Sequence, residues 1–318
     1  MKKNSIQAWI AASRPKTLAG AAAPVIVGGS LAWHDGYQDA YKKAQELAAN
    51  NVCSQDLANQ HIVLFSIPFL LCLLFALMMQ IDANLVNDYF DCKKGTDRED
   101  RLGPARACAQ GWISPKSMIT GIAICTLLSC VIGLTIFMWN IQWELILVGL
   151  ACVAGCFLYT TKFSYLGLGD LLVLVFFGIV PVGFTYYVIT RGEWTTPLLL
   201  AGLGTGLATD TLLMVNNYRD RNQDLISGKK TLVVRFGGKF GLASYLTLGI
   251  AAAALGVAAC VIIDKPVHSL LIIIYLLLHT ATWLKLRETD GKELNAFLGK
   301  TSRNILLYGL VLTLCFAL

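Results

Sequence analysis

Residues 61–97 read HIVLFSIPFLLCLLFALMMQIDANLVNDYFDCKKGTD, an apolar stretch that ends in a dense group of polar and charged side chains. From His61 to Val86 almost every side chain is apolar, and roughly 20 such residues suffice for a helix to cross the ~30 Å hydrocarbon core of a bilayer. The polar group begins at Asn84 and ends at Asp97. Ionisable side chains at membrane depth are costly and usually serve a function. The stretch therefore predicts a transmembrane helix that carries a functional cluster at the membrane surface.

The whole chain has the composition of a membrane protein. Of its 318 residues, 56% are hydrophobic and 14% are charged, with a mean hydropathy of +0.60, which lies outside the usual range of soluble domains. Nine apolar stretches are long enough for membrane-crossing helices, approximately 17–33, 61–86, 117–139, 143–159, 168–190, 197–215, 240–263, 267–284 and 304–318. We predict an all-α, polytopic bundle of nine transmembrane helices, forming a single transmembrane domain over residues 1–318.

The distribution of positive charge predicts the orientation. If the N-terminus is cytoplasmic, alternate connections place 22 of the 26 Lys and Arg residues on the cytoplasmic side, as the positive-inside rule requires. We therefore predict a cytoplasmic N-terminus, a C-terminus outside, and a multi-pass protein of the cell (inner) membrane. The net charge of +6 follows from this topology and needs no nucleic-acid partner, and no obligate protein partner is indicated.

A second polar cluster, NNYRDRNQD at residues 216–224, follows the sixth apolar stretch as the first cluster follows the second stretch. This is a weak internal repeat that suggests two related half-sites on the cytoplasmic face. At about 100° per residue, each cluster places its side-chain oxygens on one helix face: Asn84, Asn87, Asp88 and Asp91 in the first, and Asn217, Asp220 and Asp224, with Asp210 deeper, in the second. Oxygen ligands without His or Cys favour a hard cation, Mg²⁺ in particular.

The same residues have an alternative interpretation as ordinary surface charges of a membrane protein, paired with neighbouring Lys and Arg. Two clusters in matching positions favour a site over that interpretation. The cations among them, notably Lys94, Arg219 and Lys229, suit diphosphate oxygens. For any single cation, a role in topology or a lipid headgroup contact stays open.

Four segments resemble the intramembrane aromatic prenyltransferases of the UbiA superfamily. They are SRPKTL at 13–18, NDYFDCKKGTDREDRLGPAR at 87–106, YTTKFSYLGLGD at 159–170 and NNYRDRNQDLISGKKTLVVRFG at 216–237. The resemblance covers nearly the whole chain and implies a nine-helix fold with two aspartate-rich motifs. One departure is Ser164, where some relatives carry a lysine directly before the tyrosine that matches Tyr165.

The resemblance also implies roles for individual residues. It implies that the catalytic carboxylates are Asp88, Asp91, Asp220 and Asp224, which hold Mg²⁺ together with Asn84, Asn216 and Asp97. The cations that it assigns to the diphosphate are Arg14, Lys94, Lys162, Arg219 and Lys229. For the acceptor or the prenyl chain, the candidates are Tyr159 and Asp210.

The implied reaction is Mg²⁺-dependent transfer of a polyprenyl group from polyprenyl diphosphate to 1,4-dihydroxy-2-naphthoate. It releases diphosphate and CO₂ and gives demethylmenaquinone, in an active site that faces the cytoplasm. Two alternatives stay open: another aromatic acceptor such as 4-hydroxybenzoate, and a cation or metabolite transporter, which would also place acids within helices. A CDP-alcohol phosphotransferase is disfavoured because Asp91 is followed by Cys92 and the DGxxAR segment is absent.

Overall fold

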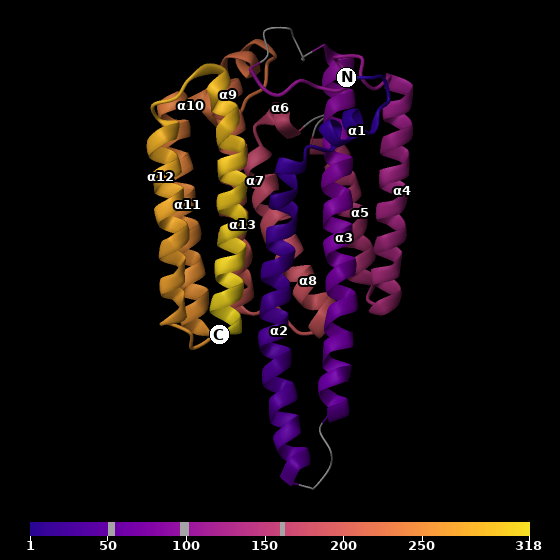
Figure 1. Ribbon diagram of the computed structural model, residues 1–318, viewed down its shortest axis with the longest axis vertical. Coiled ribbons are helices and arrows are strands. Elements are labelled where there is room, and N and C mark those ends of the chain that lie inside the picture. Colours follow the sequence, from indigo (N-terminus) through magenta and orange to yellow (C-terminus); the bar gives the residue numbers. More distant parts are fainter. Residues whose placement is uncertain (50–54, 96–101, 160–162) are drawn as a thin grey trace.

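The computed structural model describes residues 1–49, 55–95, 102–159 and 163–318 (Figure 1), and over these ranges the protein is helical with no β-strand. The first half contains α1 (Ile6–Ser13), η1 (Pro15–Thr17), α2 (Leu18–Ala49), α3 (Gln55–Lys94), α4 (Pro115–Trp139), α5 (Trp143–Leu158), α6 (Ser164–Leu166), α7 (Gly169–Leu174), the π-helix η3 (Val175–Ile179) and α8 (Val180–Thr190). The second half contains α9 (Thr196–Ile226), α10 (Leu232–Phe236), α11 (Gly238–Ile262), η4 (His268–Leu271), α12 (Ile272–Leu286), η5 (Gly291–Leu294) and α13 (Asn295–Ala317).

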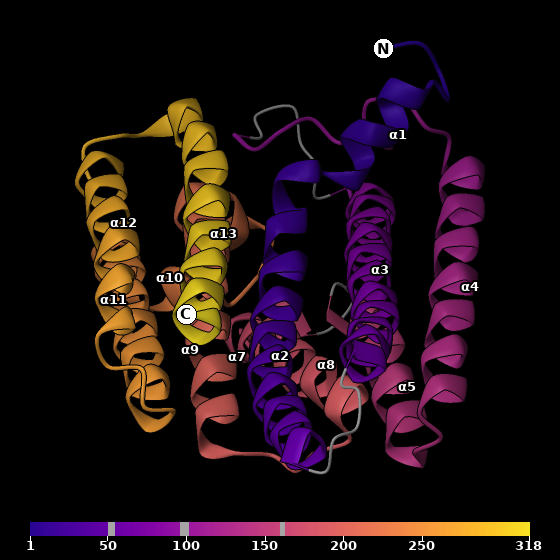
Figure 2. The same ribbon diagram turned by 60° about the horizontal axis from the view of Figure 1, so that its bottom comes forward.

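The long helices run side by side along the long axis of the molecule (Figure 1). Figure 2 shows α4 and α5 at one edge and α11 and α12 at the other, with α2 and α9 between them. The packing agrees, because α4 contacts α3, α13 contacts α2, and α11 contacts α9. The helices α3 and α9, which carry the two polar clusters, therefore belong to opposite halves of one bundle.

Six of the described helical spans are long and apolar enough to cross a membrane: Phe65–Lys94, Pro115–Trp139, Gly169–Thr190, Thr196–Ile226, Gly238–Ile262 and His268–Leu286. A seventh apolar helix, Trp143–Leu158, is shorter. Large apolar side chains are exposed on the outer helices, for example Leu127 (65% exposed) and Met138 (76% exposed) on α4. Such large exposed apolar faces suit contact with lipid and not with water. The protein is therefore a polytopic membrane protein.

The two cluster-bearing helices extend further than the apolar stretches from which they were predicted. The apolar stretches end near Val86 and Val215, where hydropathy falls, whereas α3 continues to Lys94 and α9 to Ile226, past the residues predicted to share one helix face. Neither extension contains Gly or Pro, and each helix ends beside a glycine in the left-handed region, Gly95 (φ 67°) and Gly228 (φ 75°). Glycine is the residue that most easily adopts this conformation. Both polar clusters therefore lie on helix, as their spacing requires.

One predicted span, residues 168–190, is a helix interrupted by the π turn η3. Pro181 follows this turn and has no N–H to donate, which favours a local widening of the helix. At Gly178 the widened turn meets α9, where a Cβ would lie 2.5 Å from the Gly202 carbonyl oxygen. The absence of a side chain at Gly178 thus allows the two backbones to approach closely.

Candidate active site

The segment at residues 106–108, between α3 and α4, packs onto the first polar cluster. Asp88 is 1% exposed, and its carboxylate accepts backbone hydrogen bonds from Ala107 (3.0 Å) and Cys108 (3.2 Å). Asp91, 5% exposed, pairs with the guanidinium of Arg106 at 3.2 Å. These contacts fix both carboxylates at the end of α3 and place an arginine beside them.

Deeper in α3, Asn84 anchors the SRPKTL segment. Its Nδ2 donates to the Ser13 carbonyl oxygen (2.8 Å) and to the Thr17 hydroxyl (2.9 Å), while its Oδ1 accepts from Gln80 (3.2 Å). The turn between Ser13 and Thr17 has Arg14 in the left-handed conformation (φ 47°), and the charge of Arg14 acts on the carboxylate of Asp88. The segment therefore places the positive charge of Arg14 near the first cluster.

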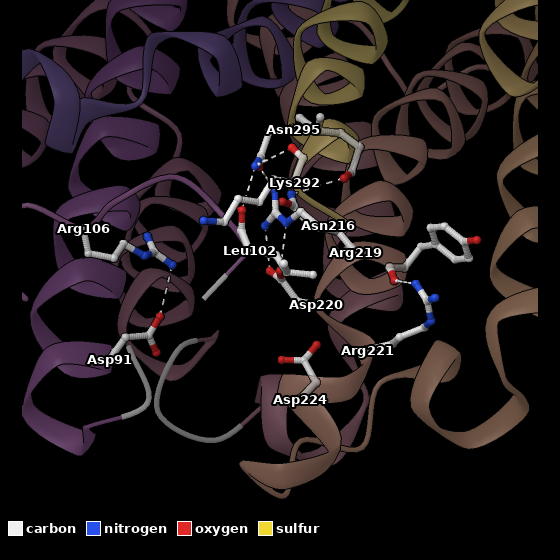
Figure 3. A network of polar contacts seen from close by, with 12 residues as sticks. Asp91, Leu102, Arg106, Asn216, Arg219, Asp220, Arg221, Asp224, Lys292 and Asn295 are labelled. Carbon is white, nitrogen blue, oxygen red and sulfur yellow. Dashed lines mark hydrogen bonds and ion pairs between the residues drawn. The ribbon is translucent and has the colours of Figure 1, made fainter. Parts of the chain in front are cut away.

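The second cluster is organised by an arginine that contacts three parts of the chain. Arg219 donates two hydrogen bonds to the carboxylate of Asp220, at 2.7 and 2.6 Å, and a third to Asn295 Oδ1 at 3.0 Å (Figure 3). Asn295 in turn donates to the Leu102 carbonyl oxygen at 2.7 Å. This network connects α9, α13 and the loop after α3. Asn295 has no motif around it, which is why the sequence did not indicate it.

The last turn of α9 carries Asp224, whose carboxylate lies 3.8 Å from the ammonium of Lys229. The turn at Gly228 brings Lys229 back, and its N–H donates to the Asp224 carbonyl oxygen at 2.9 Å. Figure 3 shows Asp91 on one side of the site and Asp220 and Asp224 on the other. Asp91 of α3 and the two acids of α9 therefore lie on opposite sides of one polar region.

Tyr165 lies between the two clusters, and sequence analysis gave it no role. The ammonium of Lys94 is 4.2 Å from the centre of its ring and that of Lys229 is 5.8 Å from it. Burial raises the pKa of the Tyr165 hydroxyl; the charge of Lys229 lowers it, and the charges of Asp91 and Asp224 raise it. A single side chain thus interacts with acids and lysines of both half-sites.

An apolar cavity of about 330 Å³ lies within the bundle. Polar residues of the site line part of its wall: Arg14, Thr17, Asn84, Asn87 and Asn216. Most of the remaining wall is apolar, and it includes Phe75, Phe176, Phe177 and Phe184, together with the predicted residue Tyr159. Phe176 and Phe177 both belong to the π turn, where the widened backbone turns two consecutive side chains toward the cavity.

Asp210, the other candidate for the acceptor, is 4% exposed and does not line the cavity. It interacts electrostatically with Asp170 of α7, and both acids act on the Tyr159 hydroxyl. Oδ1 of Asp210 and Oδ1 of Asp170 are buried and accept no hydrogen bond from the described part of the chain. Two buried carboxyl groups, each with an oxygen that accepts no hydrogen bond from the described residues, therefore interact electrostatically with Tyr159.

The predicted residues Asp97 and Lys162 lie outside the described ranges. Among the residues that are described, no three His, Cys, Asp or Glu side chains already form a metal-binding group. The donors on the two sides are oxygens only, which fits Mg²⁺, and this ion usually completes its shell with substrate phosphates and water. Oxygen donors of this kind fit a cation that takes part of its ligands from a bound diphosphate.

The chain belongs to the UbiA prenyltransferase family, whose family model matches residues 57–308. It is 36% identical over 240 residues to the 1,4-dihydroxy-2-naphthoate octaprenyltransferase of Escherichia coli (strain K12), an alignment that covers 73% of this chain and 69% of that protein. It is 34% identical over 262 residues to the enzyme of the same name from Mycobacterium leprae (strain TN), with 81% and 79% covered.

A solved structure has the same fold. A UbiA homologue from Archaeoglobus fulgidus, bound to GPP and Mg²⁺, superposes with a TM-score of 0.60 over 96% of this chain and 99% of that one, at 16% sequence identity. At this identity the likeness concerns the fold. The family membership and the fold thus agree with the all-helical bundle described above.

Proposed function

We propose that this protein transfers a polyprenyl group from polyprenyl diphosphate to 1,4-dihydroxy-2-naphthoate, releasing diphosphate and CO₂ to give demethylmenaquinone. The observation that carries the proposal is the pair of clusters on α3 and α9, with carboxylates and cations from both sides next to an apolar cavity. The acceptor is inferred from the two relatives named above. Both are named 1,4-dihydroxy-2-naphthoate octaprenyltransferase, and the alignments cover most of their length.

In this proposal Asp88, Asp91, Asp220 and Asp224 hold Mg²⁺, with Asn84, Asn216 and Asp97 as supporting residues. When bound, Mg²⁺ stabilises the negative charge that develops on the departing diphosphate. Breaking the allylic C–O bond produces a carbocation and a diphosphate, so stabilisation of the leaving group is the main catalytic task. Backbone N–H groups and arginines already hold these carboxylates, so the side chains need to move little to bind the metal ion.

The cations of the site would bind the diphosphate oxygens directly. Arg14, Lys94, Lys162, Arg219 and Lys229 are assigned this role. The orientation of Arg219 is fixed, since Asp220 and Asn295 bind its guanidinium. A guanidinium fixed in this way loses little conformational entropy when an oxyanion binds.

The apolar cavity would take the first part of the prenyl chain and bring the acceptor to it. Excluding water protects the allylic cation from hydrolysis, and the ring of Tyr159 in the cavity wall stabilises it through its π face. Asp210 does not line the cavity, so it would act on the acceptor through Tyr159, whose hydroxyl feels the charges of Asp170 and Asp210.

We further propose nine membrane crossings, a cytoplasmic N-terminus, an outer C-terminus and an active site that faces the cytoplasm of the inner membrane. The excess of Lys and Arg on one side supports this orientation. The two chain ends lie toward opposite ends of the bundle (Figure 1), which an odd number of crossings requires.

A competition assay tests the acceptor. Purified protein receives Mg²⁺, one polyprenyl diphosphate, and dihydroxynaphthoate and 4-hydroxybenzoate at equal concentration, and products are identified by mass spectrometry. A site for a bicyclic acid loses about 1–3 kcal/mol of apolar contact with a single ring, so we expect roughly 10- to 200-fold preference for the naphthoate. Predominant prenylation of 4-hydroxybenzoate would refute the acceptor and leave the prenyltransferase; transport of a cation without prenylation would refute both.

A further inference from the structure

The ring of Tyr165 contacts a lysine from each half-site. Lys94 is the last residue of α3, and its ammonium lies 4.2 Å from the ring centre. Lys229 follows α9, and its ammonium lies 5.8 Å from the same centre. Both distances are within the ~6 Å range of cation–π attraction. One aromatic ring therefore contacts two ammonium groups, one at the end of α3 and one just after α9, from opposite halves of the bundle.

Hydrogen bonds from Lys230 and Arg235 fix the backbone that carries this ring. The N–H of Lys230 donates to the Tyr165 carbonyl oxygen at 3.3 Å, and the guanidinium of Arg235 donates to the Leu166 carbonyl oxygen at 2.9 Å. Gly167 has φ 78°, and a Cβ there would lie 2.2 Å from the Lys230 carbonyl oxygen. The segment with Tyr165 is thus docked on the segment that directly follows Lys229, so ring and lysine keep a defined relation.

We propose that Tyr165 is a positioning residue for the diphosphate, whose ring holds the ammonium groups of Lys94 and Lys229 beside the space between Asp91 and Asp224. The proposal rests on the proposed function, since it names how the Mg²⁺-bound diphosphate of the substrate meets these lysines. The lysines keep their contact with the ring when the diphosphate binds.

The chemistry of the contact explains why a ring suits this position. Lysine loses much rotamer freedom when it is fixed, and a ring that holds it beforehand removes that cost from binding. The π face attracts the ammonium without accepting its hydrogen bonds, so this contact itself uses none of the N–H donors that bind phosphate oxygens. A carboxylate would instead compete with the diphosphate. Lys229 also pairs with Asp224, at 3.8 Å, and because this is longer than the ~2.7–2.9 Å of a charged hydrogen bond, the pair is a weak one.

The test measures binding of inorganic diphosphate in the presence of Mg²⁺ to the purified full chain by calorimetry, with no acceptor present. Tyr165→Leu should weaken binding about 3- to 10-fold, and Tyr165→Phe, which keeps the ring, should stay within about 2-fold of wild type. Pentafluorophenylalanine at position 165 keeps the shape but reverses the ring quadrupole, and it should weaken binding as leucine does. This variant serves also if Tyr165→Leu does not fold.

Two further comparisons separate a lysine-dependent role from a structural one. In a Lys94→Met/Lys229→Met background, Tyr165→Leu should add little, because the two effects share one cause. Phe236→Leu is the matched control: Phe236 is 63% exposed and packs on Phe240, and its loss should leave binding unchanged.

Three results would overturn the proposal. The first is wild-type affinity in folded Tyr165→Leu, and the second is equal weakening by Tyr165→Phe, which would implicate the hydroxyl. The third is tighter binding by Tyr165→Leu, which would mean that the ring competes with the diphosphate for the lysines. Because no acceptor is present, Tyr165-dependent binding of diphosphate by a protein that prenylates no naphthoate supports this proposal while refuting the proposed acceptor.

Discussion

Three acidic residues of the site are paired with a cation before any substrate binds, while Asp88 is held by two backbone N–H groups. Asp91 pairs with Arg106, Asp220 with Arg219 at 2.6 Å, and Asp224 with Lys229. Buried charges without a partner are strongly destabilising, so these pairs allow a cluster of carboxylates to exist in a membrane protein. A diphosphate with Mg²⁺ brings charges of both signs and can be accommodated by the same residues with little change in net charge.

At the residue scale, we expect Asp91→Asn and Asp220→Asn each to lower turnover at least ~100-fold, because an amide provides no negative charge for Mg²⁺. Turnover is measured with saturating polyprenyl diphosphate and naphthoate, after size-exclusion chromatography shows a folded protein. Asp290→Asn is the matched control, since the Asp290 side chain is 83% exposed and only approaches Arg221 at 3.8 Å. Near-normal turnover of both folded site variants would remove the metal assignment.

The elements show where sequence reasoning succeeds and where it stops. Apolar stretches predicted the helices because burial in lipid depends on local composition, and the 3.6-residue period correctly placed Asp88 and Asp91 on one face of α3. Hydropathy could not show that α3 and α9 continue past the apolar part, since helix propensity and a terminating glycine decide this. Nor could it show the role of Asn295 or Tyr165, whose partners are distant in the sequence.

A prediction at the element scale concerns the contact between η3 and α9. Gly178→Ala would place a methyl group 2.5 Å from the Gly202 carbonyl oxygen and against Gly206, and relieving such overlap costs about 1–3 kcal/mol. We expect a lower midpoint in thermal unfolding of the detergent-solubilised protein. The control is Gly149→Ala on α5, where nothing lies within 4 Å of the added Cβ and helix propensity favours alanine. If the two variants unfold at the same temperature, the close approach is not needed for stability.

In the whole molecule, the clustered acids and cations lie at one end of the bundle. The loop after α3, the turn after α9 and the start of α13 meet there through Arg219 and Asn295 (Figure 3). The connections at the other end contribute none of the clustered carboxylates. A charged, water-soluble leaving group such as diphosphate departs most easily where the site meets water, while an apolar chain stays within the bundle. The side that this end faces therefore decides where the reaction can take place.

Single introduced cysteines test this orientation. Lys116 at the start of α4 and Glu193 between α8 and α9 are both exposed and lie at opposite ends of the bundle. The proposed nine crossings put most Lys and Arg on the side of Lys116, and under the positive-inside rule that side would be cytoplasmic. We expect Glu193→Cys to react with a membrane-impermeant thiol reagent added to intact cells, and Lys116→Cys to react only after the membrane is opened. The unmodified protein corrects for its own cysteines. Labelling of Lys116→Cys from outside would invert the topology and place the acidic clusters on the side where cytoplasmic substrates do not reach them.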